Sequence, residues 1–565
     1  MTFFSGLIAK DQTQQRRRIG NIFLVVALLF GLLQVWACRY ALTPDGMDYL
    51  DIAREIAAGH WAAVANGYWG TLNSVLLAPL FHLHLSPERE LLLAHLEGVL
   101  ILLLAFLAFR FFLNTSLDMI SLNADAKNVD VPALPEWALC ALGYSLFLWS
   151  SLGIVTVSLI GPDLLVTAFI YFAAGWLLRL RPQAGLMNFA AFGLTLGVGY
   201  WAKAIMFPVS LVFLAVAIVR VPRWKQSLCS VLAFAVVAAP LLIALSLPRG
   251  RLTFGDSGRL NYSSFVSPGG QVINWQGIPA ASGVPKHSTR KIALEPPIYE
   301  FNGPIPGTYP PSYDPSYWNE GHRAMFNLRS QISVIVHHVP PVVELLAVAQ
   351  PSLTAGFLFL LLWNSTGFLR RLSRHWELLA ISLSIVGLYM LVHFEPRFVG
   401  AFVVLIWFFL FFALPLPATS GSEPGNSQRI AGLSVTALVV VMLLLFASST
   451  AKLFVNGCPE SAESQLAMAR ELPIPPGTAI AVVGSGNYSY WAHFAHLRIV
   501  ADIMSPDEPE FWRLSEEGRQ QFYAAFRSTG AQAIVAQPPP AVTGLLNARW
   551  KQVGTTTYYY YPLHP

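Results

Sequence analysis

The chain has 565 residues, of which 55% are hydrophobic and only 12% are charged, whereas a typical soluble domain carries roughly 25% charged residues. A chain of this composition would not stay in solution, so the soluble globular classes are excluded. The formal net charge of +5 does not indicate a nucleic-acid partner, because Lys and Arg fall in short clusters between apolar runs and form no continuous basic stripe. An integral membrane protein is expected.

Apolar runs long enough to cross a bilayer recur along the chain, since a hydrocarbon core about 30 Å thick needs roughly 20 helical residues. The runs predict eleven membrane-spanning helices, at about 19–41, 90–113, 135–152, 163–180, 185–201, 204–220, 226–247, 340–363, 376–393, 397–416 and 429–450. Arg16-Arg17-Arg18 precede the first run, and no small-residue cleavage site follows it. We therefore predict a retained anchor, a cytoplasmic N-terminus and, with an odd number of spans, an exterior C-terminus.

Three regions are then expected outside the membrane. The region at about 42–89 should hold an amphipathic helix lying in the interface, with Asp51 on its solvated face, and a re-entrant apolar piece. The loop at about 248–335 is dense in Gly, Pro, Tyr and Asn and is expected to be functional and to lack regular structure. The sequence therefore predicts an α-helical polytopic membrane region at 1–450, with exterior loops, and an exterior (periplasmic) α/β domain at 451–565.

The β-type runs of that last domain are at 479–483, 498–500 and 533–535. Gly484-Ser-Gly-Asn487, which follows the first of them, is interpreted as a turn because it lacks the spacing of a phosphate-binding loop. No disulfide framework is predicted, because Cys38, Cys140 and Cys229 fall in apolar runs and Cys458 stands alone in a polar region. His82, His84, Glu88 and Glu90 are too loosely spaced for a metal site, and none is predicted there.

Charged residues recur where predicted spans meet the exterior. Asp45 and Asp48 lie in Thr43-Pro-Asp-Gly-Met-Asp48, directly after the first span. Three further motifs are Gly161-Pro-Asp163, which opens a span, Gly199-Tyr-Trp-Ala-Lys203 between two spans, and His393-Phe-Glu-Pro-Arg-Phe398 between two late spans. In their order and shared outward side, these motifs resemble the GT-C glycosyltransferases, the superfamily of protein O-mannosyltransferases and lipid A aminoarabinose transferases.

The resemblance covers about residues 19–417 and implies a glycosyltransferase of the cell envelope. Such an enzyme would move a sugar from a polyprenyl-phosphate-linked donor to a lipid, glycan or protein acceptor on the non-cytoplasmic face, in a bacterial inner membrane. It also implies that an acidic residue after the first span is the catalytic base. No cofactor is required by the motifs, and whether a divalent cation assists the phosphate stays open.

The transfer itself needs a base for the acceptor and cations for the leaving phosphate. Asp45 is the candidate base because Pro44 and Gly46 let the backbone turn there, and helix capping is the alternative. Asp48 would either share the site or face water. Asp163 would be a second acidic group or the N-cap of its own span.

The donor phosphate would be bound by Lys203 and Arg397, with His393 as a further donor to it and Tyr200 at the rim of the lipid head. The alternatives are an interfacial anchor for Lys203, a simple ion pair with Glu395 for Arg397, and a satisfied interfacial residue for His393. Two other functions fit the composition, a secondary transporter and a non-enzymatic membrane scaffold. One exterior cavity that holds Asp45, Lys203 and Arg397 would favour the enzyme.

Overall fold

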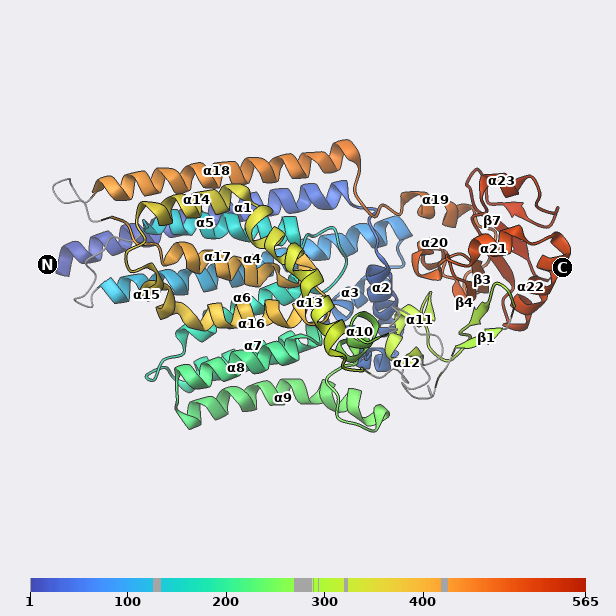
Figure 1. The fold of residues 1–565 in the computed structure, drawn as a ribbon, viewed down its shortest axis with the longest axis horizontal. Coiled ribbons are helices and arrows are strands. Elements are labelled where there is room, and N and C mark those ends of the chain that lie inside the picture. Colours follow the sequence, from blue (N-terminus) through green and yellow to red (C-terminus); the bar gives the residue numbers. More distant parts are fainter. Residues whose placement is uncertain are drawn as a thin grey trace.

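The computed structural model describes residues 2–124, 134–268, 287, 289–292, 294–319, 324–417 and 425–564, so parts of the exterior loop at about 248–335 lie outside the described residues. A bundle of helices runs along the long axis of the molecule (Figure 1). Its members are α1 (Thr2–Ala37), α4 (Pro87–Ala124), α5 (Glu136–Leu148), α6 (Asp163–Arg179), α7 (Leu186–Ala202), α8 (Met206–Arg220), α9 (Trp224–Arg249), α13 (Leu328–Val343), α14 (Pro351–Trp363), α15 (Phe368–Leu372), α16 (Trp376–Met390), α17 (Pro396–Phe412) and α18 (Gly425–Asn456).

The bundle has the surface of a membrane protein. Large apolar side chains on its outer helices are exposed, among them Val25 at 65%, Leu100 at 67% and Val236 at 71%. Within the described residues, six helices are long and apolar enough to cross a membrane, or seven when the bent pair Pro351–Trp363 and Phe368–Met390 counts as one span. The chain is therefore an integral membrane protein, and the eleven spans stay a prediction.

One predicted span is divided in the structure. A single helix was expected at about 340–363, but α13 already begins at Leu328 and continues through a π-helical turn to Val348, and α14 begins at Pro351. Gln350 has a non-helical backbone, with φ −131° and ψ 78°. Proline has no N–H for the helix and disfavours the helical conformation of the residue before it, which explains the break.

A middle layer separates the bundle from the C-terminal domain (Figure 1). It consists of α2 (Pro44–Ala57), a 3-10 turn at Trp61–Ala65, α3 (Leu72–Phe81), α10 (Ser257–Phe265), α11 (Pro310–Tyr313) and α12 (Pro315–Trp318). The exterior loop thus has short regular elements where it is described, contrary to the expectation. The expectation that Asp51 of α2 faces solvent was also wrong: this residue is only 3% exposed because the C-terminal domain and the loop cover it.

The C-terminal domain is built on a seven-stranded sheet with the order β1-β2-β4-β3-β5-β7-β6. Its strands are β1 (Arg290–Ile292), β2 (Ile298–Glu300), β3 (Ala479–Val483), β4 (Arg498–Ile503), β5 (Ala533–Ala536), β6 (Lys551–Gln552) and β7 (Tyr559–Pro562), and its helices are α19 (Glu463–Glu471), α20 (Tyr490–Phe494), α21 (Glu508–Arg513), α22 (Glu516–Ser528) and α23 (Pro540–Thr543). The three predicted β-type runs form the parallel centre β4-β3-β5. The exterior loop adds β1 and β2, since β2 pairs antiparallel with β4.

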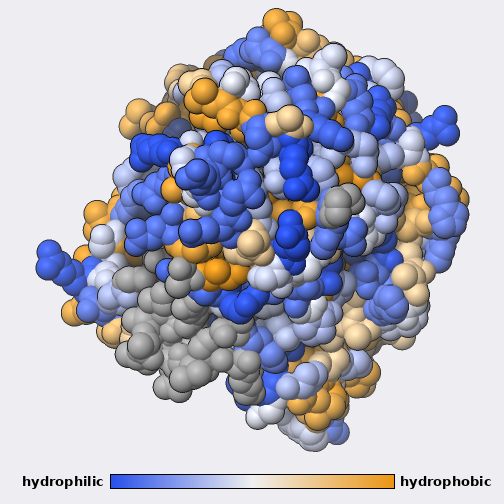
Figure 2. Space-filling view, turned by 90° about the vertical axis from the view of Figure 1, so that its right-hand side faces the viewer, coloured by the Kyte–Doolittle hydropathy of each residue, from blue (hydrophilic) through white to orange (hydrophobic). Residues whose placement is uncertain are grey.

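Successive side chains of a strand point to opposite faces of the sheet, so the side chains of the central strands belong to two different hydrophobic cores. Ile480 and Val482 belong to a core shared with Leu50 of α2 and Trp491 of α20. Their neighbours Ala481 and Val483 belong to a second core with Phe522 of α22. One face of the sheet therefore packs toward the middle layer, whereas the free end of the domain is mainly hydrophilic (Figure 2).

A disulfide joins Cys38, just after α1, to Cys458, just after α18, across 420 residues of sequence. The expectation of no disulfide was therefore wrong. The two helices run side by side, so their ends bring together cysteines that lie in unrelated stretches of sequence. Ala41 and Ser461 form a β-bridge beside the disulfide, and the Leu42 N–H donates to the Glu460 carbonyl at 3.0 Å. These links hold the segment that leads into α2.

Candidate functional site

Asp45 stands at the N-terminus of α2 with its carboxylate free of the capping role. The helix is capped by Thr43, whose Oγ1 accepts a hydrogen bond from the Gly46 N–H at 3.1 Å. Pro44 occupies the first helical position, where its missing N–H is tolerated. The Asp45 side chain remains 38% exposed. A different residue thus fulfils the capping function that was the alternative explanation for this carboxylate.

Arg397 connects three carboxylates from three parts of the chain. Its Nη2 donates to Asp45 Oδ2 at 3.0 Å, and its Nε donates to Glu395 Oε2 at 2.6 Å. Its Nη1 lies 3.6 Å from Asp163 Oδ2. Asp45, Asp163 and Arg397 lie within the first two residues of α2, α6 and α17. The ends of three helices therefore meet at one guanidinium.

Lys203 completes this cluster from the other side of Asp163. It ends α7, and its Nζ lies 2.5 Å from Asp163 Oδ1 and 3.9 Å from the centre of the Phe398 ring. Its side chain is 24% exposed and forms an ion pair, so it is neither fully solvated nor fully buried. Asp163 thus bridges the two cations and is more than the first residue of its span. We call Asp45, Asp163, Lys203, Glu395 and Arg397 the charged cluster.

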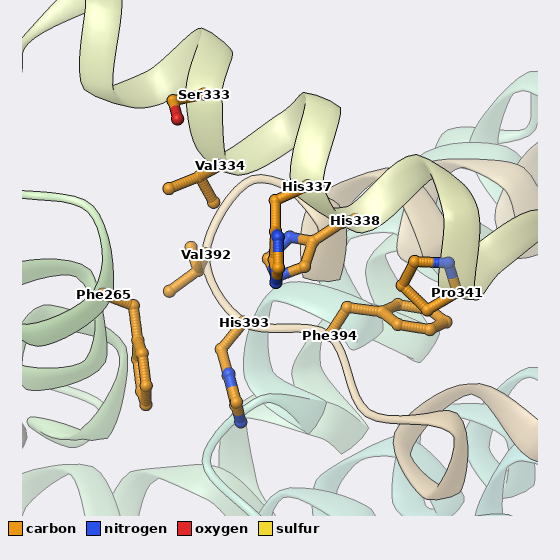
Figure 3. Close-up of a pocket in the computed structure, with 9 residues that line it drawn as sticks. All are labelled: Phe265, Ser333, Val334, His337, His338, Pro341, Val392, His393 and Phe394. Carbon is orange, nitrogen blue, oxygen red and sulfur yellow. The ribbon is translucent and has the colours of Figure 1, made fainter.

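His393 connects the charged cluster to a cavity. Its Nε2 lies 2.9 Å from Glu395 Oε1, and its ring stacks on Phe265 with centroids 4.2 Å apart. Burial raises the pKa of Glu395, but the hydrogen bond from His393 and the charge of Arg397 outweigh this effect and lower it to about 2. The cavity beside His393 has a volume of about 440 Å³ and lies between α10, α13 and the loop before α17 (Figure 3).

Two of the predicted site residues lie apart from the charged cluster. Asp48 is 0% exposed and accepts a hydrogen bond from the Ser312 hydroxyl, and burial raises its pKa well above the usual range. Tyr200 is 1% exposed, and its hydroxyl donates to the Phe254 carbonyl at 2.9 Å. The structure thus brings together Asp45, Asp163, Lys203, Arg397 and His393, and it places Asp48 and Tyr200 in packed surroundings.

Glu395 was not among the residues predicted for the site. It was expected only as an alternative partner of Arg397, whereas in the structure it also binds His393. Its position between these two residues in His393-Phe-Glu-Pro-Arg397 was the signal. Within the described residues, no group of three or more His, Cys, Asp or Glu is arranged to hold a metal ion. Glu88 pairs instead with Arg470, and Glu90 lies near Arg54 and His493.

Comparison with known proteins gives a likeness in structure. No family model matches the chain, and no curated protein matches its sequence. ArnT from Cupriavidus metallidurans in the apo state has a TM-score of 0.55 at 12% identity, over 96% of this chain and 97% of ArnT. ArnT bound to undecaprenyl phosphate has a TM-score of 0.54 at 12% identity, with the same coverage. An Archaeoglobus fulgidus oligosaccharyltransferase, complexed with zinc and sulfate, matches over 91% of this chain and 68% of its own at 13% identity, with a TM-score of 0.42.

The likeness to ArnT extends over nearly the whole chain, so the bundle, the middle layer and the C-terminal domain are all included in it. The expected resemblance to the GT-C superfamily is thereby confirmed at the level of the fold. This integral membrane protein therefore has the GT-C fold that is represented by ArnT.

Proposed function

We propose that this protein is a glycosyltransferase that moves a sugar from a polyprenyl-phosphate-linked donor to an acceptor hydroxyl or amine at the exterior end of the bundle. The observation that carries the proposal is the charged cluster, in which a partly exposed carboxylate, Asp45, shares Arg397 with Asp163, and Asp163 also pairs with Lys203. The fold of ArnT, which binds undecaprenyl phosphate, supports the choice of donor. The acceptor is a lipid, a glycan or a protein.

The proposed reaction assigns a role to each part of the cluster. The Asp45 carboxylate takes the proton of the acceptor as the new bond to the anomeric carbon forms. The bond from that carbon to the phosphate oxygen breaks, and its electron pair stays on the lipid phosphate. Lys203 and Arg397 stabilise the resulting charge, and the N-termini of α2, α6 and α17 add their partial positive charge.

Lys203 and Arg397 are already paired with carboxylates in this structure, and one of these carboxylates is the proposed base, Asp45. An arriving phosphate competes with Asp45 for Nη2 of Arg397. When Arg397 turns to the phosphate, Asp45 loses the hydrogen bond at its Oδ2, and this oxygen becomes available to the acceptor. Donor binding would in this way prepare the base.

The cavity beside His393 supports an approach of the donor from the bilayer. His337 and His338 of α13 line it, together with Phe265 and Phe394 (Figure 3). Apolar side chains of the same helix are exposed, with Val336 at 62% and Ile332 at 51%. A lipid-linked headgroup could therefore reach His393 and the charged cluster while its chain stays in hydrocarbon.

The exterior placement of the site is also part of the proposal. Disulfides persist in oxidising compartments, and the one between Cys38 and Cys458 lies at the same end of the bundle as Asp45. The mainly hydrophilic C-terminal domain is at that end as well. These observations support a non-cytoplasmic active site, with the N-terminus in the cytoplasm and the domain in the periplasm of a bacterial envelope.

The test is transfer by the purified protein in lipid nanodiscs, with a panel of radiolabelled polyprenyl-phosphate sugars and envelope lipids, glycans or peptides as acceptors. We expect one donor to be consumed by the wild type and not by Asp45→Asn. The control variant is Glu463→Gln, which neutralises an exposed carboxylate of α19. Facilitated movement of a solute across the bilayer without donor consumption would instead indicate the transporter, and neither activity would indicate the scaffold.

A further inference from the structure

A second group of charged residues occupies the interface between α2 and the C-terminal domain. His493 of α20 is 1% exposed, and its Nδ1 lies 2.7 Å from Asp51 Oδ1 of α2. Its Nε2 lies 3.4 Å from Glu90 Oε1 of α4. A single imidazole of the C-terminal domain thus contacts one carboxylate of the middle layer and one of the bundle.

Asp51 is fixed by more than His493. Its Oδ2 accepts from the Thr308 N–H at 2.6 Å, its Oδ1 accepts from the Thr308 hydroxyl at 3.2 Å, and Nη1 of Arg54 lies 3.3 Å from Oδ1. Nη2 of Arg54 lies 3.5 Å from Glu90. Four chain segments, around residues 51, 90, 308 and 493, therefore meet at these two carboxylates. We call Asp51, Arg54, Glu90, Thr308 and His493 the interface network.

The interface network and the charged cluster share the helix α2. Asp45 and Asp51 are six residues apart, which is about 9 Å along the axis at a rise of 1.5 Å per residue. Asp45 itself is 38% exposed, and its Oδ2 accepts a hydrogen bond from Arg397. Its position therefore depends on where α2 sits, and Asp51 is the residue through which α2 binds His493 of the C-terminal domain. A shift of about 1 Å at a reacting group is enough to slow a reaction substantially.

We infer that His493 is a positioning residue for the transfer reaction: by binding Asp51 and Glu90 it fixes α2 and aims Asp45, so that the C-terminal domain is a working part of the active site. This inference rests on the proposed function. The five residues of the charged cluster all lie outside the C-terminal domain. The inference therefore gives this domain a role in the reaction that the charged cluster alone does not.

Protonation of His493 strengthens this link. Burial and the charge of Arg54 lower the pKa of His493, but Asp51 and Glu90 outweigh them and raise it above its ordinary value of 6.5. The other titratable group nearby is His496, whose own pKa is lowered by burial and by the charges of Arg54 and His493. Because the pKa of His493 is raised in the folded state, its stabilising contribution is complete below 6.5 and is lost as the pH rises through the folded-state pKa.

The experiment compares His493→Gln with the control His564→Gln, which changes an exposed histidine near the C-terminus. We expect His493→Gln to lower kcat about tenfold or more and to leave the donor KM within about twofold, because the phosphate would be bound by residues of other helices. The decline of wild-type kcat at high pH should be absent from the variant. An unchanged kcat, or a loss confined to the donor KM, would overturn the inference.

A second measurement does not depend on transfer. Amide hydrogen exchange of residues 44–57, corrected for intrinsic rates, should rise at least severalfold in His493→Gln and remain unchanged in His564→Gln. Unchanged exchange in His493→Gln overturns the positioning role, whatever the activity. If exchange rises but the wild type transfers no sugar, the link to α2 stands while the proposed function fails.

Asp51→Asn keeps the test decisive if His493→Gln does not fold. It removes the charge of the partner and should lower kcat and raise the exchange of α2 in the same way. The loss in the double variant should be less than additive, because both changes break the contact between His493 and Asp51. Additive losses in the double variant would show that the two residues act separately and would overturn the inference.

Discussion

The two charged groups on α2 are built from similar residues and differ in access. In the charged cluster, the Asp45, Lys203 and Arg397 side chains are 38%, 24% and 22% exposed. At the centre of the interface network, the Asp51 and His493 side chains are only 2% and 1% exposed, whereas Arg54 at its edge is 28% exposed. Partly exposed ion pairs can exchange partners with a ligand, whereas sealed pairs cannot do so without opening the fold. Solvent exposure, more than residue type, therefore distinguishes the charged cluster, which is suited to chemistry, from the interface network, which is suited to holding α2 in place.

The largest expected effect tests this separation at Asp45. Asp45→Asn should lower kcat by about 10²–10⁴-fold, because the amide keeps the shape but cannot take a proton. The thermal midpoint should change little, since Thr43 and not Asp45 caps the helix. Single-turnover assays and thermal unfolding, with Glu463→Gln as control, measure the two quantities. Transfer near the wild-type rate would move the base elsewhere, with Asp163 the next candidate.

The second prediction concerns the cations of the charged cluster. Lys203→Ala and Arg397→Ala should each weaken donor binding about tenfold or more, which corresponds to the roughly 1.5–3 kcal/mol of a hydrogen bond to a charged group. The loss in the double variant should be less than additive, because both act on one phosphate. Lys452→Ala, on the exposed side of α18, is the matched control. If the affinity for the donor is unchanged in both single variants, Lys203 and Arg397 form only structural ion pairs and do not bind the phosphate.

The third prediction concerns the covalent link beside α2. Cys38→Ser should lower the thermal midpoint, because removal of a native disulfide typically costs about 2–5 kcal/mol. Cys229→Ser, which removes a free cysteine, should not lower it. After reduction, a membrane-impermeant maleimide added from outside should label Cys458. Labelling of Cys458 only from the cytoplasmic side would refute the exterior placement of the site.

The smallest effect is expected at Asp48, the buried carboxyl between the two groups. Burial raises its pKa, so the folded state retains this proton to a higher pH than the unfolded state does. Its contribution therefore destabilises the fold as the pH rises from its ordinary value of 3.8 through the folded-state pKa. Asp48→Asn should keep transfer within severalfold of wild type and reduce this loss of stability. Thermal midpoints between pH 5 and 9 provide the measurement, and a loss of activity like that of Asp45→Asn would place Asp48 in the chemistry.

Local patterns account for much of what was predicted correctly. The apolar runs predicted the helices of the bundle, and the β-type runs at 479–483, 498–500 and 533–535 became β3, β4 and β5. The motifs before or after spans also predicted that Asp45, Asp163, Lys203 and Arg397 would share one side, because each lies at the end of an apolar run. These features depend on neighbours within a few residues, so a single sequence displays them.

Only the tertiary structure decided which distant residues meet. The pairing of Cys38 with Cys458 depends on α1 and α18 lying side by side, and the addition of β1 and β2 to the sheet depends on the exterior loop reaching β4. Asp51 looked like a solvated residue because Arg54 and Glu55, three and four residues later, share its face of α2, yet His493, 442 positions later, seals it. The sequence by itself determined a membrane bundle with charged residues at the ends of its helices and a small α/β domain. Packing between distant segments determined that this domain closes over α2, because burial is a property of the whole fold and not of the local pattern.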